Sequence, residues 1–180
     1  MAVQSKFFEV STGCGGTIGV HVIRGTLARP APIVLHLAGG TFMGVARQRP
    51  IATLLAEAGA VVVSANYPTG VAHPFPEALE ALYGLLGHLH ERRAAFASKR
   101  SPLFVAGEEA GGNLAAALTL MARDRLGPPI AGQILLSPML DADMSSCSFR
   151  DAEAGSVGCK WADGWTVYLG GAEKAAHPYA

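Results

Sequence analysis

The chain has 180 residues, of which 50% are hydrophobic and 16% are charged, and this composition predicts one compact globular domain with a large core. Fourteen basic and fourteen acidic residues cancel, and no run of Lys and Arg offers a footprint for nucleic acid or an anionic membrane. We expect a small neutral or apolar partner instead.

The N-terminal residues lack the apolar stretch of a secretory signal, and no segment is long and apolar enough to span a bilayer. The cysteines, Cys14, Cys147 and Cys159, are odd in number and lack the spacing of metal ligands. We therefore expect free thiols in a reducing, cytoplasmic environment.

Two extended runs, at residues 7–10 and 18–23, flank Gly15-Gly16-Thr17 and predict an antiparallel hairpin at a sheet edge. Short apolar runs follow, and their continuity is typical of parallel strands covered on both faces. These runs are residues 33–37, 61–65, 103–106 and 134–136.

Helical patterns separate these strands. Behind Pro74-Phe75-Pro76-Glu77, a helix-start signal, leucines recur at helical spacing and predict a buried face. These leucines are Leu79, Leu82, Leu86 and Leu89. Another helix is expected from residue 109, little regularity over residues 141–157, and a short helix over 161–169. The order of three strands followed by alternating helices and strands predicts an α/β fold, with a mostly parallel sheet flanked by helices.

Residues 105–118 predict a nucleophile elbow, the sharp turn between a strand and a helix that lifts one side chain above a parallel sheet. Its glycines are Gly107 and Gly111, and the lifted residue is Glu109, where a serine hydrolase carries its serine. A carboxylate is already ionised at neutral pH and cannot be activated by a histidine as a serine is. The neighbouring Glu108 is expected to support the fold, with its side chain directed away from the pocket.

Several strings together resemble the hormone-sensitive-lipase branch of the α/β-hydrolases. They are the segment from His73 to Glu80, the elbow ending Ala110-Gly111-Gly112-Asn113-Leu114-Ala115, the pair Ser137-Pro138, and the tail from Trp165 to Ala180. The resemblance covers the whole chain but only the N-terminal, larger part of the family's domain. It implies one α/β-hydrolase domain over residues 1–180, incomplete at the C-terminus, with a partial cap-like region at 141–180.

The resemblance also implies an esterase or lipase site, in which a serine attacks an ester and backbone amides hold the oxyanion. The family's His-Gly-Gly-Gly string falls on Leu37-Ala38-Gly39-Gly40, so Gly39, Gly40 and the amide of Ala110 are the expected oxyanion hole. Glu109 would place a repulsive negative charge beside that hole. His36 should point to the opposite face of the sheet, as a core histidine.

Other positions depart from the family. Its Asp-Tyr-Arg string appears here as Asn66-Tyr67-Pro68, and its catalytic acid and histidine follow the position of Ala180. A sheet that stops after six strands would leave a hydrophobic edge. We therefore hypothesise that a second polypeptide, either a cleaved C-terminal fragment or a separate subunit, supplies the remaining strands.

Three interpretations of function stay open. Glu109 could act in a hydrolase, as an attacking carboxylate or as an acid or base; the chain could be a non-catalytic relative that uses its acyl pocket for binding or scaffolding; or it could be a structural fragment. The expected ligand is a small acyl-ester-like molecule. No cofactor or metal is expected, because the sequence contains neither a metal-ligand cluster nor a dinucleotide-binding glycine string.

Overall fold

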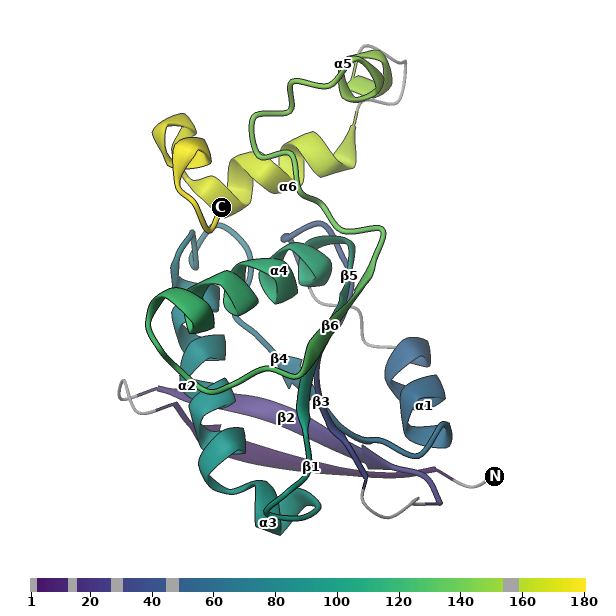
Figure 1. Cartoon of the computed structure of the whole chain (residues 1–180). Helices are drawn as coiled ribbons and strands as arrows, with labels where there is room; N and C mark the ends of the chain where they lie inside the picture. Colours follow the sequence, from purple (N-terminus) through teal and green to yellow (C-terminus); the bar gives the residue numbers. More distant parts are fainter. Residues whose placement is uncertain (1–2, 13–15, 27–30, 45–48, 154–158) are drawn as a thin grey trace.

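A computed structural model describes residues 3–12, 16–26, 31–44, 49–153 and 159–180, and it shows one six-stranded sheet with helices on both faces (Figure 1). The strands are β1 (Gln4–Ser11), β2 (Thr17–Arg24), β3 (Ile33–Leu37), β4 (Val61–Asn66), β5 (Leu103–Glu108) and β6 (Gly132–Leu136). Their order in the sheet is β1-β2-β4-β3-β5-β6. The pairs β1·β2 and β2·β4 are antiparallel, whereas β3, β4, β5 and β6 run parallel. The predicted fold class is therefore confirmed.

The helices alternate with the parallel strands, as the sequence pattern predicts. They are α1 (Pro50–Glu57), α2 (Glu77–Glu91), α3 (Arg93–Phe96), α4 (Glu109–Asp124), α5 (Cys147–Glu153) and α6 (Lys160–Leu169), followed by the 3-10 helix η1 (Ala172–Ala176). A proline occupies the first turn of α1, where its missing N–H costs no helical hydrogen bond.

The larger core lies between the sheet and the helices α2 and α4. The four predicted leucines of α2 are all fully buried there, and they pack with one face of the strands and with Leu114, Leu118 and Met121 of α4. A smaller core lies on the opposite face, where Ala52 and Ala56 of α1 pack against Val34 and Val62. The strands β3 and β4 are therefore covered on both sides.

The N-terminal hairpin is confirmed, and its strands are longer than the sequence pattern predicts. Gly15 and Cys14 lie outside the described residues, and Thr17 already belongs to β2. Of the other cysteines, Cys147 is exposed and Cys159 is buried, and both are free thiols.

Two predictions about the C-terminal part are wrong. The sequence pattern of β6 predicts a strand covered on both faces, yet β6 pairs only with β5 at the end of the strand order, and Ile134 and Leu136 are 37% and 38% exposed. Residues 141–157 contain the short helix α5, which their polar composition hides. The exposed residues of β6 agree with the hydrophobic edge that the sequence predicts.

The predicted helix at 161–169 is confirmed as α6, which lies with α5 and η1 at the end of the molecule where β5 runs into α4 (Figure 1). Aromatic contacts attach it. The ring of Tyr168 stacks on the ring of Phe42, with centroids 4.0 Å apart. The ring centroid of Trp165 lies 5.1 Å from that of Phe42. This packing places residues 159–180 over the carboxyl ends of the strands, where α/β proteins bind ligands.

Candidate functional site

The turn between β5 and α4 has the geometry of an elbow. Strand β5 ends at Glu108 and α4 begins at Glu109, whose φ of 47° is in the left-handed region. A methyl group on Gly107 would lie 2.2 Å from the carbonyl oxygen of Gly111, and one on Gly111 would lie 2.2 Å from that of Leu37. Both elbow glycines are therefore required by close backbone packing.

Glu109 borders a cavity at the carboxyl end of the sheet. The cavity has a volume of about 270 Å³ and is lined by Ala38, Gly39, Gly40, Pro50, Ile51, Glu108 and Glu109. A methyl group on Gly39 would lie 3.4 Å from Oε2 of Glu109, so the carboxylate lies against this glycine loop. The structure thus brings together Glu109 and the two glycines that the sequence assigns to an oxyanion hole.

The amide of Ala110, the third predicted oxyanion donor, has an internal partner. It donates a hydrogen bond to the carbonyl oxygen of Gly40 over 3.3 Å. On the other side of the turn, the amide of Met139 donates to the carbonyl of Glu109 over 3.0 Å. An amide that already serves a backbone carbonyl is not directed at a ligand, so this arrangement differs from an open oxyanion hole.

A polar network lies on the α1 face of the sheet, beneath the elbow. His36 is fully buried, with Nδ1 2.9 Å from Oγ of Ser64 and Nε2 3.0 Å from Oε1 of Glu108. Arg49 donates from Nε to Oγ of Ser64 over 2.9 Å and from a terminal nitrogen to the side-chain oxygen of Asn66. His36 is therefore held at the sheet face, as expected from strand alternation.

The donors of this network can be placed in one consistent direction. The carboxylate of Glu108 accepts, so a neutral His36 ring carries its proton on Nε2 and accepts at Nδ1. The Ser64 hydroxyl then donates to Nδ1 while it accepts from Arg49. The chain of donation runs from Arg49 through Ser64 and His36 to Glu108.

Glu108 corrects one expectation. Its side chain does support the fold through His36, but Glu108 also lines the cavity beside Glu109, so it does not point wholly away from the pocket. Strand alternation alone misses this because β5 ends at that residue. Its second oxygen, Oε2, is buried and has no hydrogen-bond partner among the described residues. Two carboxylates therefore border one small cavity.

The negative charge of this region affects the pKa of Tyr67. Its buried hydroxyl donates to the carbonyl of Ala38 over 2.7 Å. Burial raises the pKa of Tyr67 above its usual range, and the negative charges of Glu108 and Glu109 raise it further. Such a field disfavours any further anion at the glycine loop.

The histidines offer Glu109 no hydrogen bond within the described part of the chain. His36 is engaged with Ser64 and Glu108, His73 lies 2.7 Å from Glu77, and His90 contacts Arg93. His177 packs edge-on against Phe75, with ring centroids 4.9 Å apart. The elbow carboxylate thus has no imidazole partner among the described residues.

Metal ligands do not gather at this site. Over the described ranges, no three His, Cys, Asp or Glu side chains are arranged to hold a metal ion. None of the described helices has the length and apolar character needed to cross a membrane.

Comparison with known proteins agrees with this architecture. A family model described as the alpha/beta hydrolase fold matches residues 33–180. The chain belongs to the α/β-hydrolase family, in its hormone-sensitive-lipase-like esterase branch. The α/β-hydrolase resemblance that the motifs carry is thereby confirmed.

Individual α/β-hydrolases are similar over much of this chain. The carboxylesterase NlhH of Mycobacterium tuberculosis is 34% identical over 131 residues, which are 72% of this chain and 40% of that protein. An esterase of Pyrobaculum calidifontis superposes with a TM-score of 0.84 at 29% identity, over 99% of this chain and 60% of the other. An esterase of Pseudomonas putida has a TM-score of 0.84 at 25% identity, over 99% and 57%. The chain spans about two fifths of the length of the curated relatives that it matches.

Proposed function

We propose that the elbow cavity binds a small acyl-ester-like ligand and does not hydrolyse it by serine chemistry. The proposal rests on residue 109, where the side chain lifted by the turn is a carboxylate that lies against Gly39. The hydrogen bond from the Ala110 amide to Gly40 supports it, because that amide is already engaged. The relationship to carboxylic-ester hydrolases supplies the ligand class.

Charge supports binding without hydrolysis. A tetrahedral intermediate carries a developing oxyanion, and a fixed carboxylate within a few ångströms raises its energy. A neutral ester with a hydrogen-bond donor, such as a hydroxy ester, can instead donate to Glu109. The cavity therefore suits a ground-state ligand better than the transition state of ester hydrolysis.

An ester assay tests this proposal directly. We expect the purified protein, Glu109→Ala and Glu109→Ser to hydrolyse 4-nitrophenyl acetate no faster than buffer. Glu109→Ser should not create esterase activity, because the described histidines His36, His73 and His90 are engaged with other side chains. Glu57→Gln, at an exposed position on α1, is the matched control for loss of one acidic charge.

Binding is measured separately, by titrating methyl 3-hydroxybutyrate and following the backbone amide NMR signals of Gly39 and Gly40. Saturable shifts that weaken in Glu109→Ala but persist in Glu57→Gln are expected. Turnover that Glu109→Ala abolishes and Glu57→Gln preserves would overturn the non-hydrolytic proposal.

A second candidate is hydrolysis through Glu109 within an assembly. The left-handed elbow still presents a side chain to the cavity, and carboxylates can act as nucleophiles or as acids and bases. In this candidate, a second polypeptide pairs with β6 and supplies an acid and a histidine. The exposed apolar residues Ile134 and Leu136 support such a contact.

Gel filtration with intact-mass analysis of the protein purified from its source distinguishes the assembly from the isolated chain. A stable complex should contain a companion polypeptide, and substituting Leu136→Asp should release it. A monodisperse monomer without any companion would exclude this candidate.

A further inference from the structure

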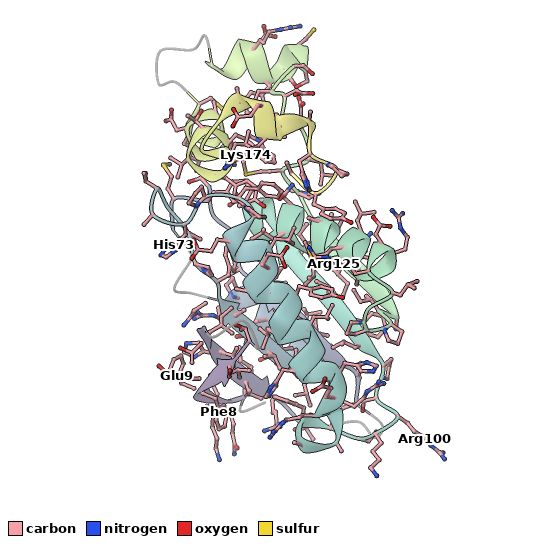
Figure 2. All side chains as sticks on the ribbon, turned by 90° about the vertical axis from the view of Figure 1, so that its left-hand side faces the viewer. Phe8, Glu9, His73, Arg100, Arg125 and Lys174 are labelled. Atoms are coloured by element: carbon pink, nitrogen blue, oxygen red, sulfur yellow. The ribbon has the colours of Figure 1, made fainter. Side chains whose placement is uncertain are left out.

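A second cavity lies far from the elbow, between the N-terminal hairpin and the C-terminal end of α2 with α3. It has a volume of about 390 Å³, and its apolar wall includes the buried side chains of Val10, Val20 and Val22. Phe8 and Phe96 add aromatic surface. Figure 2 shows β1, which carries the labelled Phe8, beside the lower half of α2. Its size and apolar lining are typical of sites for small molecules.

Two arginines provide the positive charge of this hairpin cavity. Arg24, at the end of β2, donates from Nη2 to the carbonyl of Phe96 over 3.0 Å, and this bond fixes the direction of its guanidinium group. A guanidinium carries five N–H donors, so one such bond leaves others to face a ligand. Arg92 follows the last residue of α2 and lines the same cavity.

His88 lies beside these charges. Burial lowers the pKa of His88, the positive charge of Arg92 lowers it further, and the nearby Glu91 opposes both effects. Arg92 and His88 both line the hairpin cavity. His88 also packs edge-on against Phe96, with ring centroids 6.4 Å apart.

Glu9, the acidic residue in the lining of the cavity, directs its side chain elsewhere. Glu9 borders the cavity, but side chains alternate along a strand, so its carboxylate lies on the opposite face from Phe8 and Val10. Phe7 shares the face of Glu9, and its ring contacts His21 there, with centroids 5.1 Å apart. Glu91, the last residue of α2, is outside the cavity lining. The carbonyls that end α2 carry about half a negative charge, which the two guanidinium groups of the lining outweigh.

We propose that the hairpin cavity binds a small amphipathic carboxylate, with its hydrocarbon tail on the valine wall and its carboxylate between Arg24 and Arg92. A cation would meet the positive charge of both guanidinium groups, and a neutral molecule would not balance that charge. A carboxylate instead accepts charge-assisted hydrogen bonds from them. This site does not depend on the elbow, and no residue is shared between the two cavities.

Octanoate is the probe for this site, with octanol and octylammonium as neutral and cationic probes of the same chain length. We expect octanoate to shift the imidazole NMR signals of His88 saturably and to raise the pKa of that ring. Octanol should bind about tenfold more weakly, and octylammonium should produce no saturable shift.

Matched variants locate the carboxylate. Arg92→Gln should weaken octanoate binding about tenfold and leave octanol binding unchanged. Arg100→Gln removes the same charge from an exposed turn outside the cavity and should change neither. Glu9→Gln should also have little effect, because its carboxylate faces away. Circular dichroism verifies that each variant is folded.

Three results would overturn the proposal. They are the absence of a saturable His88 shift up to about 20 mM octanoate, equal affinity for octanoate and octanol, and equal loss of octanoate binding in Arg92→Gln and Arg100→Gln. Because none of these measurements uses the elbow, failure here leaves the proposed function of Glu109 untouched.

Discussion

The face of the sheet under α2 and α4 differs from the face under α1 in how it is filled. On the first face, leucines from both helices pack over the strands and are fully buried. On the second, a small cluster of alanine, valine and isoleucine gives way to a polar network around His36, and the cover is absent at Ile134 and Leu136 of β6. Hydrophobic burial therefore stabilises the first face, whereas hydrogen bonds and a partly uncovered strand characterise the second.

This difference indicates that the two faces have different roles. The α2 and α4 face secures the strands and fixes the elbow helix, while the α1 face carries the polar groups connected to the elbow through Glu108. Substitutions on the two faces should then differ in size and in sensitivity to pH.

The largest expected contrast compares a leucine from each face. Leu82→Ala removes a fully buried side chain and should reduce the free energy of unfolding by about 2 to 5 kcal/mol. Leu136→Ala, at a position 38% exposed, should cost well under half as much in the isolated chain. Urea denaturation of both variants measures this, and equal losses would contradict the contrast.

The next largest change in unfolding free energy is expected at the elbow glycines. Gly111→Ala places a methyl group 2.2 Å from the carbonyl oxygen of Leu37, so β3 and α4 must separate. We expect a loss of about 1 to 3 kcal/mol. The control is Gly87→Ala, where a methyl group meets nothing within 4 Å and should stabilise α2 by about 0.5 to 1 kcal/mol. Equal losses of unfolding free energy in Gly111→Ala and Gly87→Ala would show that close backbone packing at the elbow does not cause the destabilisation.

The polar network should respond in an asymmetric way. His36→Leu leaves the carboxylate of Glu108 without its imidazole donor and should cost about 1 to 3 kcal/mol. Adding Glu108→Met removes the unpaired charge and should recover part of that loss. Thermal and urea unfolding of the single and double variants form the test. A double variant less stable than the sum of the single losses would refute the assigned pairing.

The smallest effect is the dependence of stability on pH. The pKa values of His21 and His88, one on each face, are lowered mainly by burial, with further lowering by Arg49 and Arg92 respectively. The unfolded chain therefore binds protons more readily, and stability is fully present above pH 6.5 and falls as the pH drops through the folded pKa values. Solvent screening should keep each effect below about 1 kcal/mol.

Urea midpoints at about pH 7.5 and 5.5 measure this dependence, in the window where the usual histidine pKa lies. His21→Gln and His88→Gln should each reduce the difference between the two midpoints, and His73→Gln, at an exposed ring, is the control. An unchanged difference in both test variants would show that neither ring contributes.

Much of the fold follows from the sequence because its signals are local. The leucine spacing of α2, the apolar runs of β3, β4 and β5, and the glycines of the elbow each identify an element without knowledge of its neighbours. The exposure of β6 cannot be predicted from local sequence, since it depends on what pairs beside the strand. A continuous apolar run therefore predicts a covered strand even where the cover is absent.

The candidate site is only partly predictable for the same reason. Glu109, Gly39 and Gly40 come together as the motifs indicate. The sequence does not predict that Ser64 and Arg49 belong to the polar network, because a serine in an apolar strand and an arginine before a helix match no motif. Strand register could have placed Ser64 beside His36, but it is known only after pairing. The engagement of the Ala110 amide depends on the loop conformation at Gly40, which no residue pattern specifies.

The left-handed backbone of Glu109 links the stability of the fold to the elbow cavity. For a residue other than glycine this conformation costs about 1 to 2 kcal/mol, so the contacts of β5 and α4 with their neighbours must supply that energy. The loss of backbone freedom at residue 109 therefore occurs during folding. A ligand that meets the Glu109 carboxylate finds its backbone already ordered, so binding carries no further entropy cost for fixing that backbone.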